Sequence, residues 1–333
     1  MRGLRRPAVQ PPTLRQDGVG GKEAARNRVR RAAEPTCELG FPDHWNRPDV
    51  RGALHAMQGW VCAYCQCEID PRDGGDVDHF RPKQGGAAVG HTGYWWLAYS
   101  FDNYLLCCRR CNEHIKREQF PVRGNARADD RDDDPEAHEH RLLIDPARDG
   151  ELVERCLRVD VVDDLCPLCP SPTEGRDHPM CERIEETARL MQLDEDVDAR
   201  RPRVRARVAV IQATKSVSGT DGLREKAGRY HPHSAAWRDA LRTFAPDVKL
   251  PSAEEELGWL LAQILERINL GYQSRAAEHE REVWAKRMEQ ALWTLAFLWK
   301  NPPTGRPDDV KAWLDAHKLT AVVEARVRRL SSP

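Results

Sequence analysis

Apolar residues recur at helical spacing over much of the second half of the chain. Beyond residue 250 they fall three or four positions apart, at Leu257, Leu261, Ile264 and Ile268. Ser252 and Glu255 precede this run at the spacing of a capping box, in which each side chain bonds the other residue's backbone amide. The pattern predicts a helix that begins after Pro251 and ends at Gly271, because glycine commonly terminates helices.

The same periodicity predicts two longer helical stretches, over about 275–299 and about 307–329. The first leaves Trp293 and Trp299 off its apolar face. That face carries Trp284, Met288, Ala291, Leu295 and Leu298. A stripe of this kind is typical of a helix-bundle core, and the alternative is a face that docks a partner protein.

The middle of the chain has a different pattern, in which short strands and turns follow a helix expected over 48–58. The segment 75–83 begins as a short strand, which ends in an acid next to a histidine before Pro82 breaks the run. Residues 103–106 form a second expected strand, and a helix opens near Asn112. The order predicts an α+β fold, in which a small strand–loop–strand–helix unit adjoins a mostly α-helical remainder.

Composition places the chain among globular proteins of about two domains, with 333 residues, 40% of them hydrophobic and 32% charged. The 52 basic and 53 acidic residues nearly cancel, so net charge neither indicates nor excludes a polyanionic partner. The longest apolar run, Ala291–Trp299, is too short to cross a membrane. No secretory signal follows the N-terminal arginines, so a cytoplasmic location is expected.

Local charge is more informative than net charge. Residues 1–35 hold nine Arg or Lys and three acidic residues, with frequent Gly and Pro and weak helical periodicity. We expect a mostly irregular basic extension, which is either a solvated tail or a non-specific phosphate-binding arm. The stretch 129–139 is acidic and is typical of a solvated linker or loop.

The 11 cysteines predict metal binding, because a reducing compartment disfavours disulfides. Two CxxC pairs, Cys62 with Cys65 and Cys108 with Cys111, supply four thiolates for a structural Zn²⁺ ion. The alternatives are a lost zinc site or thiols buried as small apolar groups. A second zinc site is left open for a weaker group, which comprises Cys166, Cys169, His178 and Cys181, with Cys156 nearby.

The residues between and after the two CxxC pairs resemble the HNH endonucleases, whose core is the ββα-metal fold. His79 matches the first position of the motif, Asn103 the second and Asn112 the third, which makes this the HNN variant. Asn112 directly follows Cys111, as the family pattern requires. The resemblance implies a small zinc-stapled ββα-metal core over 48–123.

Longer strings are similar to a narrower branch, the PtuB-like HNH effectors of Septu and retron-linked anti-phage systems. They include "CAYCQCEID", "VDHFRPK" and "RLLIDPARDG", and the likeness covers about 50–200. It implies a DNA endonuclease that leaves a 5′-phosphate and a 3′-hydroxyl. It also implies an ATPase partner within an anti-phage defence complex.

Phosphodiester hydrolysis needs an activated water and positive charge near the phosphate oxygens. His79 suits the general base, because an unperturbed imidazole is partly neutral near pH 7. Asp78 and Asn112 offer oxygen ligands for a hard divalent ion, expected to be Mg²⁺. Neighbouring strand residues point to opposite faces, so a kink must bring Asp78 and His79 together. The family resemblance implies that Asn103 bonds across the hairpin and orients His79.

Other polar and aromatic residues lie near these positions. Lys83, Arg109 and Lys116 are candidates to bind the phosphate backbone, and His114 is expected to be a bystander. The aromatic residues at 94–96 are expected to pack beneath the hairpin rather than to stack on bases.

Three hypotheses about function follow from these patterns. The first is a metal-dependent nuclease with DNA as substrate. The second is a non-catalytic zinc module that binds nucleic acid through its basic arm, and the third is a helical scaffold with a vestigial zinc finger. The expected segments are a basic extension (1–47), the nuclease core (48–123), an acidic linker (124–140), a family-associated extension (141–215) and a helical C-terminal region (216–333).

Overall fold

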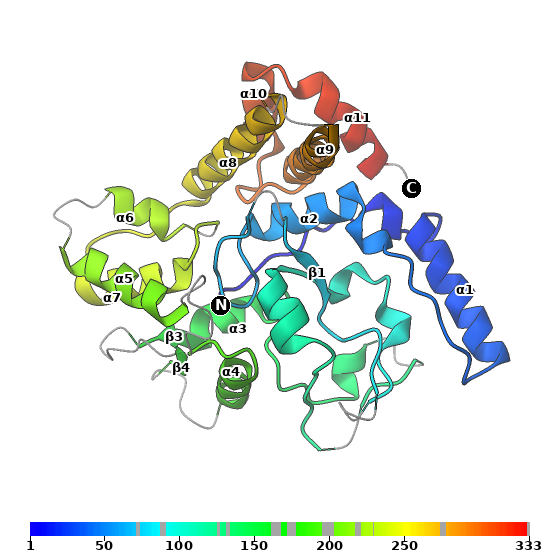
Figure 1. Ribbon diagram of the computed structural model, residues 1–333. Helices are drawn as coiled ribbons and strands as arrows, with labels where there is room; N and C mark the ends of the chain where they lie inside the picture. Colours follow the sequence, from blue (N-terminus) through cyan, green and yellow to red (C-terminus); the bar gives the residue numbers. More distant parts are fainter. Residues whose placement is uncertain are drawn as a thin grey trace.

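The computed structural model shows an α+β chain, as the sequence predicts, with many helices and two small antiparallel sheets (Figure 1). The described residues are 1–70, 74–86, 91–124, 127–130, 134–160, 168–171, 178–194, 203–216, 221–228, 230–273 and 278–331. None of the helices in this part of the chain is long and apolar enough to cross a bilayer.

A two-stranded hairpin and the helix before it form the centre of the molecule. Helix α2 (Pro48–Gln58) begins and ends as predicted, because proline suits the first turn and Gly59 follows with a φ of 66°. Strands β1 (Asp76–His79) and β2 (Tyr104–Cys107) pair antiparallel. The Gln58 side chain donates to the Leu106 carbonyl (2.7 Å) and accepts from its amide (3.2 Å), which ties α2 to β2.

Four C-terminal helices cover the other side of α2 (Figure 1). They are α8 (Ala253–Gln273), α9 (Glu278–Lys300), α10 (Pro307–Ala316) and α11 (Thr320–Ser331). The α2, β2 and α9 side chains belong to one hydrophobic core, which includes Leu54, Leu106 and Leu295. The hairpin and the C-terminal helices are therefore stabilised by the same buried surface.

One prediction about these helices is confirmed, and three need correction. The capping box is confirmed, because the Ser252 amide lies 2.8 Å from the Glu255 carboxylate and the reverse bond is 3.3 Å. Helix α8 continues through Gly271, where a single glycine costs only about 1 kcal/mol. Trp293 is buried, since α9 is surrounded by other elements on all sides there. The single helix predicted over 307–329 is two helices, separated by a turn in which Lys318 has a φ of 57°.

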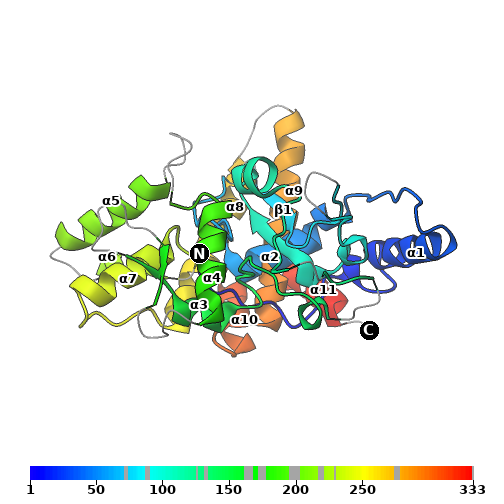
Figure 2. The ribbon, with the colours of Figure 1, turned by 90° about the horizontal axis from the view of Figure 1, so that it is seen from below.

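A smaller lobe lies on the left of Figure 1 and Figure 2. It holds α5 (Arg203–Ser216), α6 (Asp221–Lys226) and α7 (Ser234–Phe244), packed around a second apolar cluster that contains Trp237. The elements between this lobe and the hairpin are α3 (Gly150–Cys156), β3 (Leu157–Val159), β4 (Leu168–Pro170) and α4 (Pro179–Leu190). Strands β3 and β4 form the second small sheet.

The N-terminal extension is more ordered than the sequence predicts. Residues Val19–Ala33 form helix α1, because arginine and alanine favour helix even where no apolar stripe exists. The segment before it is not a solvated tail. Arg2 is buried and lies 3.0 Å from Glu154, and the Arg6 guanidinium donates to three backbone carbonyls in the segment 101–104.

The acidic stretch also folds back onto the core, so its prediction as a solvated loop is wrong for Glu139. The Glu139 side chain is buried and accepts a 2.6 Å hydrogen bond from Arg81. Glu136 pairs with Arg81 and with Arg141, at 2.6 Å from the latter. Two buried arginines need these carboxylates, since a buried charge is costly without a partner.

Gly52 marks the closest approach of α2 to α9. A Cβ there would lie 2.5 Å from the Cβ of Trp293 and 3.0 Å from the Thr294 amide nitrogen. We expect Gly52→Ala to lower the free energy of unfolding by about 1–3 kcal/mol, because the two helices must move apart. Urea unfolding measures this change.

Gly258→Ala is the matched control, since Gly258 is an exposed α8 residue with open space around its Cβ. We expect that variant to be neutral or more stable by up to about 1 kcal/mol. Equal effects of the two substitutions would contradict the close packing of α2 against α9.

Candidate functional site

The hairpin presents its polar side chains in a fixed register. Asp76 pairs with Cys107 and His79 with Tyr104 at the two ends of the ladder. Because strand residues alternate, Asp76 and Asp78 share one face while Val77 and His79 share the other. All four residues of β2 are buried, so packing holds this register.

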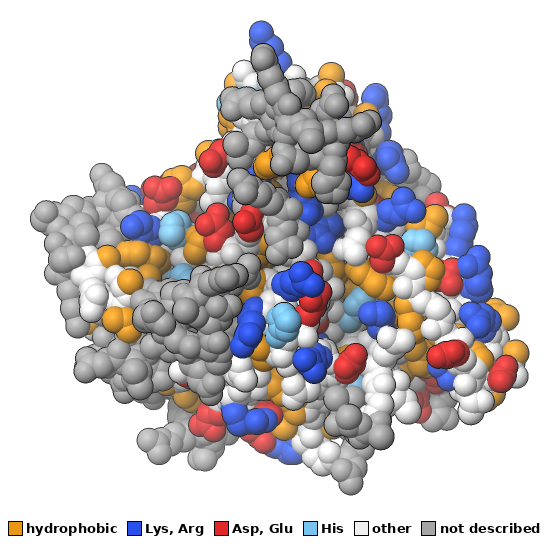
Figure 3. Space-filling view, in the orientation of Figure 1, with side chains coloured by type: hydrophobic (Ala, Val, Ile, Leu, Met, Phe, Trp, Pro, Cys, Tyr) orange, Lys and Arg blue, Asp and Glu red, His pale blue; other side chains and the backbone are white. Residues whose placement is uncertain are grey.

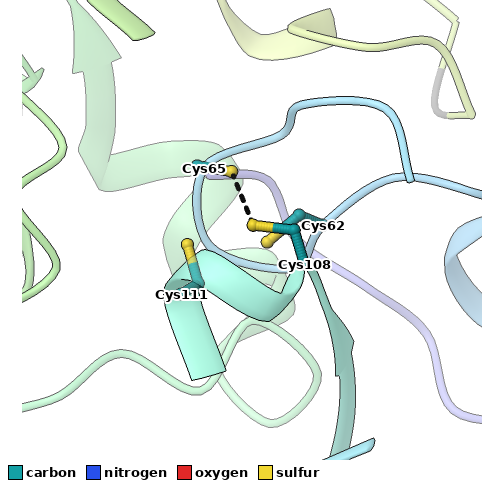
Figure 4. A group of neighbouring side chains, drawn as sticks. All are labelled: Cys62, Cys65, Cys108 and Cys111. Carbon is teal, nitrogen blue, oxygen red and sulfur yellow. Dashed lines mark hydrogen bonds between the residues drawn. The ribbon is translucent and has the colours of Figure 1, made fainter. Parts of the chain in front are cut away.

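The four predicted zinc ligands meet at one end of the hairpin (Figure 4). Cys62 and Cys65 lie in a turn after α2, where Gln66 has a φ of 59° and donates to the Cys62 carbonyl (3.1 Å). Cys108 follows β2, and Cys111 lies in the π-helical segment Arg110–Lys116, labelled η6. The predicted convergence of the two CxxC pairs is therefore confirmed.

The geometry of the four cysteines suits a zinc ion. Their Sγ atoms all lie within 4.8 Å of one another, and the Cys65 and Cys108 sulfurs are 3.8 Å apart. Sulfurs on a tetrahedron with Zn–S bonds of about 2.3 Å lie about 3.8 Å apart. Burial raises the pKa of Cys62, whereas hydrogen bonds from Cys111, Cys62 and Cys65 lower the pKa of Cys108. A divalent cation would relieve the repulsion that otherwise prevents all four from ionising.

His79 is held in one orientation at the far end of β1. Its Nε2 lies 3.0 Å from the Ala98 carbonyl oxygen, which can only accept, so Nε2 carries the proton. The Trp45 and Tyr104 rings meet the imidazole edge-on, with centroids 4.7 and 5.0 Å away. Burial, with the charge of Lys83, lowers the pKa of His79 to about 3. The ring is therefore neutral at pH 7.

Asn103 bonds across the hairpin, as the family resemblance implies. Its Oδ1 accepts from the Arg81 amide (2.7 Å), and its Nδ2 donates to the Arg81 carbonyl (2.8 Å). The Phe80 amide donates to the Asn103 carbonyl (2.8 Å). These bonds fix the backbone directly after His79.

Asp78 has different partners from those that the sequence predicts. Its carboxylate accepts hydrogen bonds from Lys116 (3.0 Å) and Tyr64 (2.7 Å) and is buried. Lys116 also donates to the His79 carbonyl (2.8 Å) and is fully buried, so it cannot reach a phosphate. The Asn112 amide donates instead to Asp76 (3.3 Å).

The two expected Mg²⁺ ligands, Asp78 and Asn112, therefore have different hydrogen-bond partners. Both offer oxygen atoms of the kind that Mg²⁺ prefers, but Asp78 is bonded to Lys116 and Asn112 to Asp76, and no hydrogen bond between described residues links the two side chains. The ladder pairs both Asp78 and His79 with β2, so the alternation keeps their side chains on opposite faces.

Several residues of this site carry no motif signal. Trp45, Tyr64 and Ala98 lie outside the strands of the hairpin, and their contacts with it depend on the tertiary fold. Tyr94 is buried, which confirms its packing role, whereas Trp95 and Trp96 are half-buried. His114 is exposed, and Arg109 is exposed and paired with Glu113.

Among the described residues, the second cysteine group forms no cluster of three or more metal-binding side chains. Cys166 lies outside the described residues, and Cys169 is half-buried on β4. The Cys156 sulfur lies 4.0 Å from Nδ1 of His178, which itself accepts from the Met180 amide (3.1 Å). A second zinc site stays a prediction.

The fold and the cysteine cluster together define an α+β protein with a four-cysteine site able to hold zinc. The chain is similar to the Septu protein PtuB of Bacillus mycoides (strain KBAB4), with 30% identity over 139 residues. The match covers 40% of this chain and 46% of that relative, so it spans less than half of either protein. No family model and no solved structure matches the chain.

Removal of one thiol from the cluster should release the metal. We expect wild-type protein to bind about one zinc ion tightly and Cys108→Ala to bind none and to unfold at lower temperature. Native mass spectrometry and thermal melts measure the two effects.

Cys107→Ala is the matched control, because Cys107 is the buried neighbour of Cys108 and lies outside the cluster. It should keep its zinc. Loss of zinc from Cys107→Ala with retention by Cys108→Ala would show that the ligand set is different.

Proposed function

We propose that the protein is a metal-dependent HNH endonuclease that hydrolyses phosphodiester bonds of DNA. The order of a thiol-clamped hairpin and a following helical segment supports this proposal, because it corresponds to the ββα-metal core of the resemblance. The observation that carries it is the state of His79. Its Nε2 donates to the Ala98 carbonyl, and Nδ1 has no hydrogen-bond partner within the described residues.

In this proposal His79 is the general base. A water in line with the phosphorus loses a proton to Nδ1 as its oxygen bonds to the phosphorus. The bond between the phosphorus and the 3′-oxygen breaks, and the leaving oxygen takes up a proton from solvent, which gives a 5′-phosphate and a 3′-hydroxyl. Asn103 is a positioning residue, because it fixes the backbone directly after His79. The imidazole is neutral at pH 7, which is the form that a general base requires, and the same burial that lowers its pKa makes it a weaker proton acceptor until a bound phosphate offsets the charge of Lys83.

The proposed ligands of the divalent ion remain Asp78 and Asn112, with Mg²⁺ as the expected cation. A bound cation there would supply positive charge to the phosphate oxygens. In the structure the Lys116 ammonium neutralises Asp78, so an ion that binds this carboxylate competes with Lys116. If the purified protein cleaves no DNA with or without a divalent cation, a non-catalytic zinc module that binds nucleic acid becomes the better interpretation.

The similarity to the Septu protein PtuB supports a cellular setting for this activity. We place the protein as the nuclease effector of an anti-phage defence complex. A toxic nuclease needs restraint, and a partner protein can provide it, which favours an ATPase companion that senses infection.

Loss of the His79 imidazole should abolish cleavage. We expect His79→Ala to cut supercoiled and linear DNA roughly 10²–10⁴ times more slowly than wild type in Mg²⁺ or Mn²⁺, because it lacks the general base. Gel assays of product over time measure the rate, and zinc content shows that the variant is folded.

His114→Ala is the control, since His114 is an exposed imidazole in the same helical segment. It should cut like wild type. Undiminished cutting by folded His79→Ala protein would rule out the role assigned to His79.

The defence assignment makes a separate prediction about partners. The protein should co-purify with an ATPase encoded by the adjacent gene when the two are co-expressed. Size-exclusion chromatography with light scattering measures the complex. A monomer with full and unregulated activity in the presence of that gene product would contradict the assignment.

A further inference from the structure

A half-buried ammonium lies beside His79 without an ion-pair partner. Lys83 has no carboxylate within 4.0 Å among the described residues, and its Nζ lies 4.8 Å from the centre of the Trp45 ring. Burial lowers the pKa of Lys83, while Asp78 and Glu118 raise it from beyond ion-pair distance. A partly desolvated cation of this kind gains stability from an anion supplied by a ligand.

Lys83 and His79 contact the same indole. The His79 ring meets Trp45 edge-on with centroids 4.7 Å apart, at an interplanar angle of 86°. The cation and the neutral imidazole therefore lie near each other, on one aromatic side chain of the 3₁₀ turn His44–Asn46, labelled η2. An anion bound at Lys83 is thus held close to the proposed base.

The basic helix α1 adds further positive side chains near the two aromatic turns. It packs against η2 and against the 3₁₀ turn Trp95–Leu97, labelled η4. The Arg31 guanidinium lies 5.5 Å from the Trp95 ring, and its Nε is buried without a hydrogen-bond partner. Arg28 is exposed, with no ion pair to any described residue.

We call these three side chains, Lys83, Arg31 and Arg28, the cationic strip. Lys and Arg side chains are visible over α1 at the right edge of Figure 3. Trp95 lies three residues before Ala98, whose carbonyl accepts a hydrogen bond from His79. Arg31 and Lys83 therefore contact the two aromatic turns that lie next to the proposed base, at Trp95 and Trp45. The Arg31 guanidinium over the Trp95 ring suits a phosphate joined to a flat base better than it suits an acidic side chain, because guanidinium and indole both offer planar faces.

We propose that the cationic strip binds the phosphate backbone of the nucleic-acid strand whose scissile phosphodiester faces His79. The inference rests on the proposed endonuclease function and extends it to a path for the substrate. The occupant is nucleic acid, and an acidic peptide is the outcome that the experiment must exclude. Phosphate contacts of this kind position the substrate without reading its sequence.

The test measures binding in a His79→Ala background, so that cleavage does not intervene. Fluorescence anisotropy with a labelled DNA duplex, over a range of salt concentrations and without added divalent ions, gives the slope of log K against log salt. We expect Lys83→Gln, Arg31→Gln and Arg28→Gln each to reduce the magnitude of that slope by about 0.9, the amount for one lost phosphate contact with a duplex.

Lys311→Gln removes an equal charge from an exposed position on α10 and is the matched control. Its slope should equal that of the background protein. A triple strip variant with the same slope as Lys311→Gln would overturn the proposal. Equally tight binding of polyglutamate, with the same dependence on the three residues, would overturn the nucleic-acid assignment.

The result also separates this inference from the proposed function. A reduced slope in the strip variants, together with wild-type protein that never cuts DNA, would refute the endonuclease and leave a nucleic-acid-binding strip. Cutting that depends on His79, with unchanged slopes in all three variants, would refute the strip alone.

Discussion

The clamp made by four cysteines is the constraint on which the rest of the structure depends. It joins the turn after α2 to the end of β2, and β2 is the strand that sets the register of β1. Four buried thiolates would be unfavourable by themselves, since their mutual repulsion and their burial oppose ionisation. A metal ion converts the same group into a source of folding free energy.

The end of the hairpin distant from the cysteines is held by neutral and charged hydrogen bonds instead. The Asn103 side chain bonds both the amide and the carbonyl of Arg81. The Arg81 side chain in turn donates to Glu139, which also accepts a hydrogen bond from the Tyr94 hydroxyl (2.7 Å). His79 therefore lies between the four-cysteine cluster and a buried polar network. Such rigidity fits the proposed role of His79, because a general base must hold one nitrogen in a fixed position.

Sequence reasoning identified the local features because neighbouring residues determine them. The CxxC spacing predicted the cysteine cluster, and Pro48 with Gly59 predicted both ends of α2. It missed contacts between distant segments, such as Glu139 with Arg81 and Trp45 with His79, because no local signal carries them. Helix α1 was also missed, since it has no apolar stripe and its position depends on η2 and η4. The roles of Asp78 and Asn112 stay predictions, and here the structure offers other partners for both.

The central claim is that the clamped hairpin holds His79 neutral, with its proton on Nε2. Nitrogen-15 NMR of the histidine side chains in zinc-loaded protein at pH 7 observes this directly, with the His79 signals assigned by comparison with a His79→Gln sample. The account predicts a protonated Nε2 and an unprotonated Nδ1 for residue 79. A proton on Nδ1, or a charged ring at pH 7, would contradict it.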